Sequence, residues 1–514
     1  MWHAHLKQGA VPTWFGWILT IGLSFYIFAV FMARSTCFLT PSVVWSPLGL
    51  LTSLLFVVAC FNRVRCVSWQ FRPVHFSPLM VGLIIFFVQL SWLLYMGPLS
   101  IPDVEFQIAQ GDSLRFSDWH PLLHTWFLWG LMRIWHSLWF LAIVQISLFA
   151  LILAWTYKTI ARQGYLRIAD ALFVFLLINP ANFAILRCPI KDVAFMLAVF
   201  GSLTCLINFN ADPDWGTKFF NQFLMGFLLF VCTFVRHNGI LFSVPIIVML
   251  PFIAKKCKKC VSPLFVVAFC MIFSVGYIGL KTVLFRQGVY VVSRCAEGRE
   301  SEKYGESVGL IMTGLTSLYF TSYDKTPESV RDLMDAMGAS KCQSYAGDYN
   351  SFKFRVPKLT GRTPSEILSE KTSLSHLLRM LYDGIRSDAV ATLGGIRDVT
   401  SLVWDPFPHA ECSFNVQTYD FRNCWLMHVL ATMPLCWFFT SVGFGLLVMI
   451  FLLTWGWIRK GGAVLVYVLP IVCYNFGTML LLCGNDWRFF YAMVVAVPIS
   501  AIGIVMLSDV NCRK

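Results

Sequence analysis

Carboxylates and cations gather in four short polar segments that separate long apolar stretches of the sequence. If the apolar stretches cross a membrane, these charges lie at its edge, where charged side chains are costly to bury and tend to be functional or solvated. Carboxylates and cations together at one membrane edge indicate a site for a polar, anionic substrate delivered from lipid. The candidate residues are Asp103, Glu105, Asp118, His120 and His124 in residues 100–127, Arg187 and Lys191 in residues 178–195, Arg236, His237 and Asn238 in residues 235–239, and Asp486 and Arg488 in residues 484–491.

The first segment supplies three candidates for a general base. Asp103 follows directly on an apolar stretch, and Glu105 is two residues further on. On a helix, side chains two positions apart point in different directions, so we expect different roles for the two carboxylates and choose Asp103 as the base. Asp118 is the third candidate catalytic carboxylate. Its place three residues before Pro121 also suits a helix N-cap, which is a purely structural role.

The histidines allow a metal-binding and a substrate-binding interpretation. His120 and His124 lie one helical turn apart, a spacing that suits a metal ion. Two histidines alone do not make a metal site, so we expect no metal and no cofactor. We expect contacts with the substrate from His120, His124, His237, Asn238 and Asp486.

The cations of the later segments are candidate ligands of a donor phosphate. Arg187 and Lys191 flank Pro189, which begins an apolar helix, and a helix N-terminus favours anions. Arg236 and Arg488 lie in two further turns beside polar partners. The alternative to phosphate binding is that these residues belong to ordinary hairpin turns and that their side chains extend to the membrane–water interface.

The composition identifies lipid as the main solvent of the chain. Of 514 residues, 57% are hydrophobic and 13% are charged, against roughly 25% charged residues in soluble domains. The formal net charge is +13. A basic excess at membrane edges is typical of topology signals and does not indicate nucleic-acid binding.

The sequence predicts an all-α polytopic membrane protein with about twelve transmembrane helices. Each span needs about 20 largely apolar residues to cross the hydrocarbon layer. We expect juxtamembrane helices beside the spans and one large loop outside the membrane. The predicted spans are 14–33, 46–61, 76–99, 138–157, 168–186, 190–209, 219–235, 239–254, 261–285, 435–458, 462–484 and 488–508.

Basic clusters predict which side of the membrane each connection occupies. Lys and Arg favour cytoplasmic connections, and five clusters fit one side provided that residues 120–136 do not cross the membrane. We expect that segment to lie in the interface or to dip in and return. Both termini are then cytoplasmic, and all four candidate segments are external. The clusters are Arg63, Arg65 and Arg72; Lys158, Arg162 and Arg167; Lys255, Lys256, Lys258 and Lys259; Arg459 and Lys460; and Arg513 and Lys514.

We predict three parts along the chain. Residues 1–285 form a membrane domain with the catalytic external loop 100–137, residues 286–424 form a large periplasmic or external loop domain, and residues 425–514 return to the membrane. An even number of cysteines in an oxidising compartment permits two disulfides in three possible pairings, and free thiols are the alternative. The four cysteines of the loop domain are Cys295, Cys342, Cys412 and Cys424.

These motifs resemble the GT-C superfamily of membrane glycosyltransferases, which use polyprenyl-phosphate-linked sugars. The resemblance rests on an acidic residue soon after an early span and on an Asp-x-His-Pro-like motif that opens an apolar helix. The plan is also similar to that of phage-type serotype-converting glucosyltransferases that decorate O-antigen. Here two extra spans precede the acidic loop. The matching residues are Asp103, the run Asp118-Trp119-His120-Pro121-Leu122-Leu123-His124, the pair Lys191-Asp192 and the turn Arg236-His237-Asn238-Gly239.

The resemblance implies a concrete reaction. A sugar, glucose or another hexose, moves with inversion from a polyprenyl-phosphate donor to a surface glycan such as O-antigen of lipopolysaccharide, on the external face of a bacterial inner membrane. Asp103 would deprotonate the acceptor hydroxyl, and cations would stabilise the departing phosphate. A flippase and a donor synthase are possible partners, and nucleic acid is not. The implied phosphate ligands are Arg187, Lys191, Arg236 and Arg488.

Three other functions remain open on the sequence alone. A transporter or flippase of a lipid-linked glycan would keep charges at mid-membrane, often in paired repeats, whereas these charges crowd one face. A membrane acyltransferase that modifies a surface polysaccharide would also use histidines in membrane helices. A structural or assembly subunit would leave the clustered carboxylates unexplained.

Overall fold

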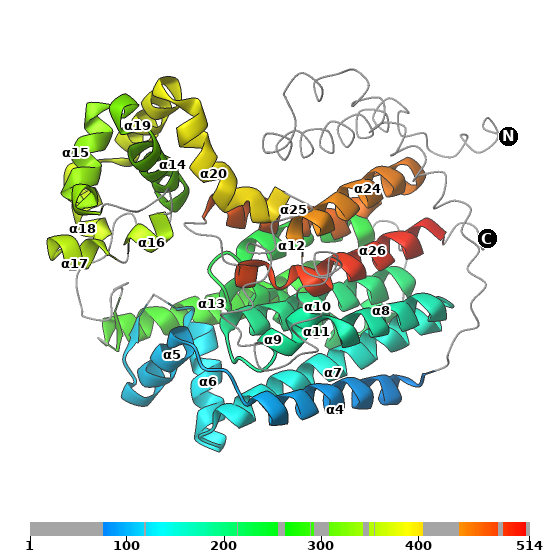
Figure 1. Cartoon of the computed structure of the whole chain (residues 1–514). Helices are drawn as coiled ribbons and strands as arrows, with labels where there is room; N and C mark the ends of the chain where they lie inside the picture. Colours follow the sequence, from blue (N-terminus) through cyan, green and yellow to red (C-terminus); the bar gives the residue numbers. More distant parts are fainter. Residues whose placement is uncertain are drawn as a thin grey trace.

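The computed structural model describes ten stretches of the chain, and they are helical almost throughout (Figure 1). The predicted spans 14–33 and 46–61 lie outside the described residues, as do Asp118 and Asp486. The described stretches are residues 76–117, 120–212, 214–254, 263–287, 289–291, 308–342, 349–353, 355–404, 441–481 and 487–509.

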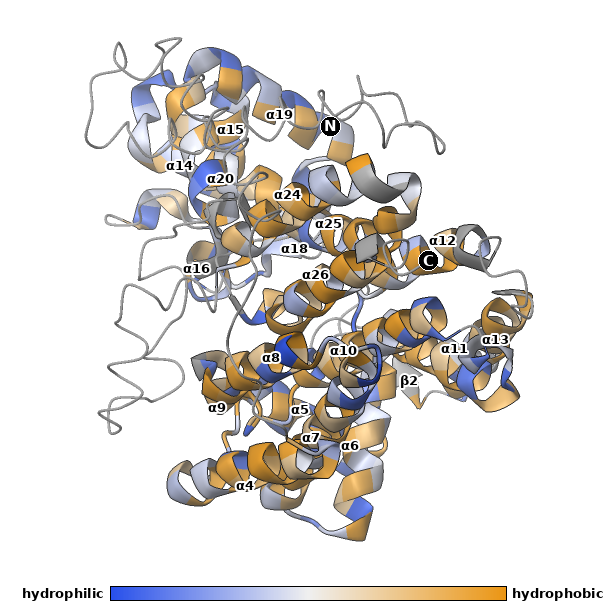
Figure 2. Cartoon of the chain, turned by 90° about the vertical axis from the view of Figure 1, so that its right-hand side faces the viewer, coloured by the Kyte–Doolittle hydropathy of each residue, from blue (hydrophilic) through white to orange (hydrophobic). Residues whose placement is uncertain are grey.

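A bundle of apolar helices forms the first half of the described chain and is completed by the last helices. The first group is α4 (Pro78–Met96), α5 (Pro102–Ser113), α6 (Leu122–Ile134), α7 (Leu138–Arg162), α8 (Leu166–Ile178), α9 (Pro180–Ile185), α10 (Lys191–Ala211), η1 (Trp215–Thr217), α11 (Phe219–Phe234), α12 (Ile240–Ala254) and α13 (Pro263–Arg286). The last group is α24 (Val442–Lys460), η6 (Gly461–Val464), α25 (Leu465–Leu480), η7 (Trp487–Phe490) and α26 (Met493–Asp509). Figure 2 shows the hydrophobic character of these helices.

Six helical segments of the described chain are long and apolar enough to cross a membrane, as a multi-pass membrane protein requires. Four shorter apolar helices accompany them: Phe219–Phe234, Ile240–Pro251, Gly309–Thr321 and Val442–Ile458. The all-α prediction is confirmed for the described residues, but twelve spans are not. The six segments are Pro78–Met96, Leu138–Arg162, Lys191–Ala211, Leu264–Arg286, Gly461–Leu480 and Arg488–Leu507.

The predicted span 168–186 is one place where the structure differs. Its residues form α8, of 13 residues, and α9, of 6 residues, with a break at Asn179-Pro180. Proline has no N–H to continue the helical hydrogen bonds of α8. The Asn179 side chain instead accepts a hydrogen bond of 3.0 Å from Ala181 N and caps the new helix.

Helix α10 forms the centre of the bundle. Over an apolar stretch of 18 residues in α10, 89% of the residues are buried inside the protein, against 22% for the corresponding stretch of α4 and 11% for that of α13. It packs against α7, α11 and α26, so neighbouring helices enclose it, whereas α4 and α13 leave most of their apolar surface outside the bundle. Its first residues, Lys191 and Asp192, are therefore fixed at one end of the bundle, which we call the site end (left in Figure 1).

Helices α5 and α6 cover the site end. Helix α6 has 13 residues, fewer than the about 20 that a span requires, and it packs on α5. This length agrees with the expectation that residues 120–136 do not cross the membrane. Two short parallel strands lie beside these helices. β1 (Phe116–Ser117), between α5 and α6, pairs with β2 (Tyr290–Val291), which follows α13.

The region from α14 to α20 has a hydrophobic core of its own, which includes Met312, Leu315 and Leu377. It corresponds to part of the predicted loop domain 286–424, and α20 connects it to α24 (Figure 1). Of the four cysteines considered for disulfides, only Cys342 is described. The elements are α14 (Gly309–Thr321), η3 (Tyr323–Lys325), α15 (Glu328–Ala336), η4 (Ala339–Lys341), α16 (Tyr349–Lys353), α17 (Val356–Thr360), α18 (Pro364–Lys371), α19 (Leu374–Ser387) and α20 (Ala389–Trp404).

Candidate functional site

Asp103, Lys191 and Arg488 meet at the site end, although they belong to α5, α10 and η7. Oδ2 of Asp103 lies 3.6 Å from Nζ of Lys191 and 3.3 Å from Nη1 of Arg488. The three side chains are 28%, 15% and 23% exposed, respectively. They are thus largely enclosed but still partly exposed, and we call these three side chains the open cluster.

The start of α5 places Asp103 in this cluster. Pro102 begins the helix, and Asp103 and Glu105 both lie in its first turn, where negative charge is favourable. Glu105 is exposed and forms no ion pair with the described residues. As expected from the helical geometry, the two carboxylates point in different directions, and only Asp103 meets the cations.

The charge of Asp103 is set by two opposing effects. Burial would raise the pKa of this carboxyl group, but the positive charges of Lys191 and Arg488 act the other way and leave the pKa below its usual value. Asp103 is therefore ionised at neutral pH. A carboxylate held in this way is a weak base until its cations are engaged elsewhere.

His120 is a neutral partner of Lys191. Its Nδ1 lies 3.1 Å from Nζ of Lys191, and an ammonium group can only donate, so Nδ1 accepts and the ring proton is on Nε2. Burial and then the charge of Lys191 lower the pKa of His120 to about 3. The ring of Phe106 packs against the imidazole at 5.6 Å between ring centroids.

His124 has a different set of contacts from His120. It is completely buried, and its Nδ1 lies 3.1 Å from Oε1 of Gln107 on α5. Nε2 of Gln107 donates a hydrogen bond of 3.0 Å to Oγ1 of Thr125, so one glutamine fixes α6 against α5. Burial lowers the pKa of His124 to about 3. In the described chain no three His, Cys, Asp or Glu side chains are grouped as metal ligands.

Arg236 is bound by Asp192 and does not reach into the open cluster. Its Nη1 forms an ion pair with Asp192, and the two side chains are only 6% and 1% exposed. The same nitrogen donates a hydrogen bond of 2.9 Å to the carbonyl of Phe489, and the guanidinium lies 5.0 Å from the centroid of that ring. Arg236 thus ties the α11–α12 turn to α10 and η7, which fixes Arg488 in place.

The turn that carries Arg236 requires a glycine. A Cβ atom at Gly239 would lie 1.8 Å from the carbonyl oxygen of Cys232, so only glycine fits. Asn238 donates a hydrogen bond of 2.6 Å to Oγ1 of Thr478 on α25 and is buried, whereas His237 is exposed. The structure therefore gives Asn238 a structural contact, and His237 is the accessible residue of the turn.

Arg187 holds the connection that leads into α5. It is 4% exposed, and its Nη1 donates a hydrogen bond of 3.3 Å to the carbonyl of Gly97. The amide of Leu99 donates in return to the carbonyl of Arg187 at 3.1 Å. Of the four cations predicted to bind phosphate, the structure brings Lys191 and Arg488 to Asp103 and uses Arg187 and Arg236 to brace the loops around them.

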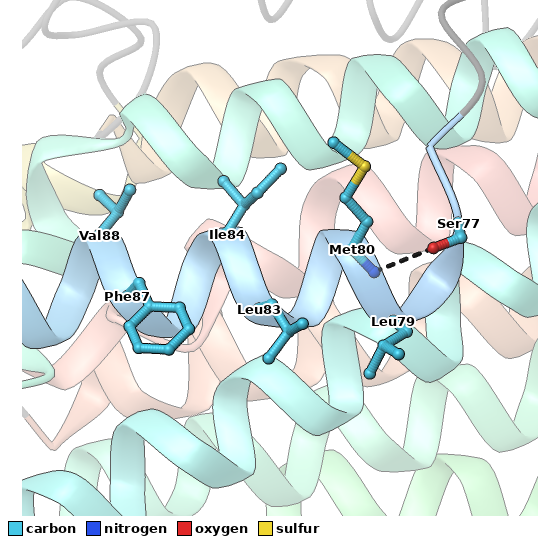
Figure 3. Close-up of a pocket in the computed structure, with 7 residues that line it drawn as sticks. All are labelled: Ser77, Leu79, Met80, Leu83, Ile84, Phe87 and Val88. Atoms are coloured by element: carbon cyan, nitrogen blue, oxygen red, sulfur yellow. Dashed lines mark hydrogen bonds between the residues drawn. The ribbon is translucent and has the colours of Figure 1, made fainter.

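A shallow groove of about 460 Å³ runs along the outer face of α4 (Figure 3). Its lining comes from this helix alone and is almost wholly apolar, as expected of a face turned to lipid. It occupies the first part of α4, whereas Asp103 follows the last part. The groove therefore contributes nothing to the charged site. It is lined by Ser77, Leu79, Met80, Leu83, Ile84, Phe87 and Val88.

Sequence reasoning missed two residues that organise the site. The sequence pattern gives Asp192 no role of its own beside Lys191, but the structure shows it as the buried partner of Arg236. Phe489 had no assigned role, yet its carbonyl accepts hydrogen bonds from Arg236 and, at 2.7 Å, from the hydroxyl of Tyr474. Backbone acceptors leave no signal in residue types. The one signal for Asp192 is its residue type, because a carboxylate at the start of an apolar helix is costly to bury without a partner.

No family model matches the chain, and neither a curated protein nor a solved structure matches it. The resemblance to membrane glycosyltransferases thus rests on the short motifs of the sequence. The geometry of the site is the independent basis for a functional argument.

Proposed function

We propose that the chain is an inverting membrane glycosyltransferase of GT-C type. It would transfer a hexose such as glucose from a polyprenyl-phosphate donor to a surface glycan, for which O-antigen is the model. The observation that supports this proposal most is the contact of one carboxylate, Asp103, with two cations, Lys191 and Arg488. A base next to a phosphate-binding pair is what transfer from a phosphate-linked sugar requires.

The reaction would use the cluster as follows. Asp103 accepts the proton of the acceptor hydroxyl, whose oxygen attacks the anomeric carbon of the donor. The bond between that carbon and the phosphate oxygen breaks, and its electron pair leaves with polyprenyl phosphate. Lys191 and Arg488 stabilise the growing negative charge on the phosphate. The proton on Asp103 then passes to water, and the product sugar has the inverted configuration.

The position of the charges supports an enzyme over a flippase. A transporter needs polar groups near the middle of the membrane, whereas Lys191 and Asp103 are at the first turns of their helices. We place the site end on the external face of a bacterial inner membrane, with both termini in the cytoplasm. A donor made in the cytoplasm and flipped would then reach the site from the outer leaflet.

The experiment compares the surface glycan of cells that express the wild-type chain, Asp103→Asn or Glu105→Gln. Mass spectrometry should find an added hexose with the wild-type chain and with Glu105→Gln. Asp103→Asn keeps the shape but removes the base, so we expect 10²–10⁴-fold less transfer, the typical contribution of a general base. Membrane levels of each variant are measured by immunoblotting. An unmodified glycan in wild-type cells that contain donor and acceptor, or full transfer by a well-inserted Asp103→Asn, would refute the proposal.

A further inference from the structure

The carboxylate assigned as the base and the phosphate of the donor would need the same two cations. In the described structure both cations contact one oxygen, Oδ2 of Asp103. A phosphate oxygen bound between Lys191 and Arg488 would have to take the place of that carboxylate oxygen. The position between the two cations is therefore occupied by an anion that is part of the protein, the carboxylate of Asp103.

We propose that Asp103 occupies the position where the donor phosphate binds and that a prenyl phosphodiester displaces it, which frees the carboxylate to act as a base. This inference rests on the proposed function, because it takes the donor as the displacing ligand. It adds an order of events, since the donor must bind before the acceptor hydroxyl can lose its proton.

The contacts of the cations explain why the carboxylate is the partner that moves. Nζ of Lys191 is also held by His120 at 3.1 Å. The guanidinium of Arg488 lies 5.5 Å from the centroid of the Phe489 ring, in a turn that Arg236 and Tyr474 anchor through the Phe489 carbonyl. Both cations thus keep other contacts when Asp103 leaves, so the phosphate meets a preformed pair.

The same contacts determine what displacement does to the basicity of Asp103. The groups that face it are Lys191, Arg488 and neutral His120, while Glu105 on its own helix is exposed. When a phosphate takes the place of the carboxylate between the two cations, their lowering effect on the pKa of Asp103 weakens, while the effect of burial, which raises this pKa, remains. Donor binding thereby converts a weak base into a stronger one.

The test measures binding without sugar transfer. The ligand is a short-chain prenyl phosphodiester with a methyl group in place of the sugar, titrated calorimetrically into the full chain in nanodiscs. If Asp103 competes with the phosphate, Asp103→Asn should bind this ligand on the order of tenfold more tightly than the wild type. Lys191→Gln should bind it more weakly, and Glu105→Gln should match the wild type. Unchanged or weaker binding by Asp103→Asn would overturn displacement.

A second measurement uses only the wild-type chain and thus does not depend on how a variant folds. A water-soluble carbodiimide with an amine labels protonated carboxyl groups, and peptide mass spectrometry quantifies the label on Asp103. The phosphodiester should increase labelling of Asp103 several-fold and leave Glu105 unchanged. A ligand that bound without displacing Asp103 would shield it, and reduced labelling would overturn the inference.

Two further ligands identify the source of the phosphate. Neither inorganic phosphate nor phosphatidylglycerol in the nanodisc should increase labelling of Asp103. An equal increase with phosphatidylglycerol would assign the position to membrane phospholipid and overturn the donor as the displacing ligand. Sugar transfer by a wild-type chain that fails these tests would leave the proposed function intact, so the two ideas fail separately.

Discussion

The bundle and the α14–α20 region each contain an ion pair between an arginine and an aspartate, but one pair is buried and the other is exposed. Arg236 and Asp192 are 6% and 1% exposed, and this pair joins two residues that are 44 positions apart in the chain. Arg397 and Asp398 are neighbours on α20, 50% and 68% exposed. A buried charge cannot be left alone, whereas an exposed pair competes with water. The Arg236–Asp192 pair thus determines how loops of the bundle are arranged, whereas the Arg397–Asp398 pair lies at the surface of α20.

The largest expected effect comes from breaking the buried pair. Arg236→Leu leaves Asp192 as an isolated buried charge, which should lower the free energy of unfolding by about 3–5 kcal/mol. Thermal unfolding of the purified protein in detergent measures this loss. The double variant with Asp192→Leu removes both charges and should recover much of the stability. A single variant as stable as the wild type would show that the pair does not brace the site.

The next effect concerns function in the open cluster. Arg488→Gln removes a charged hydrogen-bond donor worth roughly 1.5–3 kcal/mol, so under the proposed function kcat/KM for the phosphate-linked sugar should fall on the order of tenfold or more. The control is Arg133→Gln, since Arg133 is exposed on α6 and packs on Trp129, away from Asp103. Equal kcat/KM for the two variants would remove Arg488 from the phosphate site.

A smaller effect is expected from a pH-sensitive contact of the α14–α20 region. Asp388 accepts hydrogen bonds from Ala391 N, Lys325 and Ser322, and these hold its pKa at about 2. A carboxyl group with a lowered pKa stabilises the fold above its unfolded pKa and loses this contribution as the pH falls through its folded pKa. The protection factors of the α20 amides, which correct for the intrinsic exchange rate at each pH, should therefore fall between about pH 4 and pH 2. Asp388→Asn should remove this pH-dependent fall, and an identical pH profile in the variant would contradict the assignment.

The smallest effect is expected at the exposed pair on α20. Arg397→Gln should change the free energy of unfolding by less than about 0.5 kcal/mol, because exposed ion pairs contribute little. The measurement is the same thermal unfolding experiment as for Arg236. A loss comparable to that of Arg236→Leu would remove the contrast between the two regions.

The sequence predicted well what depends on local composition. The span 190–209 is close to α10, Lys191–Ala211, because the length of an apolar run largely defines a membrane helix. The grouping of the polar turns at one end followed from the alternating direction of the helices. The break at Asn179 was missed because an apolar pattern runs through it, although the proline gave the signal.

Pairing between segments was not predictable in the same way. Asp103, Lys191 and Arg236 were all candidates, but the choice of Asp192 for Arg236 depends on how α10 and α11 are rotated and packed. Those rotations follow from tertiary contacts that no single sequence pattern contains. Arg236 was consequently assigned to the substrate, whereas the structure gives it a partner within the protein.

The convergence of Asp103 and Arg488 also bears on how the protein is made. They are separated by 385 residues of chain, so at about 5–20 residues per second translation would take about 20–80 s to pass from one to the other. During that interval the nascent chain has Asp103 but lacks its second cation. The site is thus assembled late in biosynthesis. A nascent chain arrested before η7 would insert several helices into the membrane but would lack Arg488.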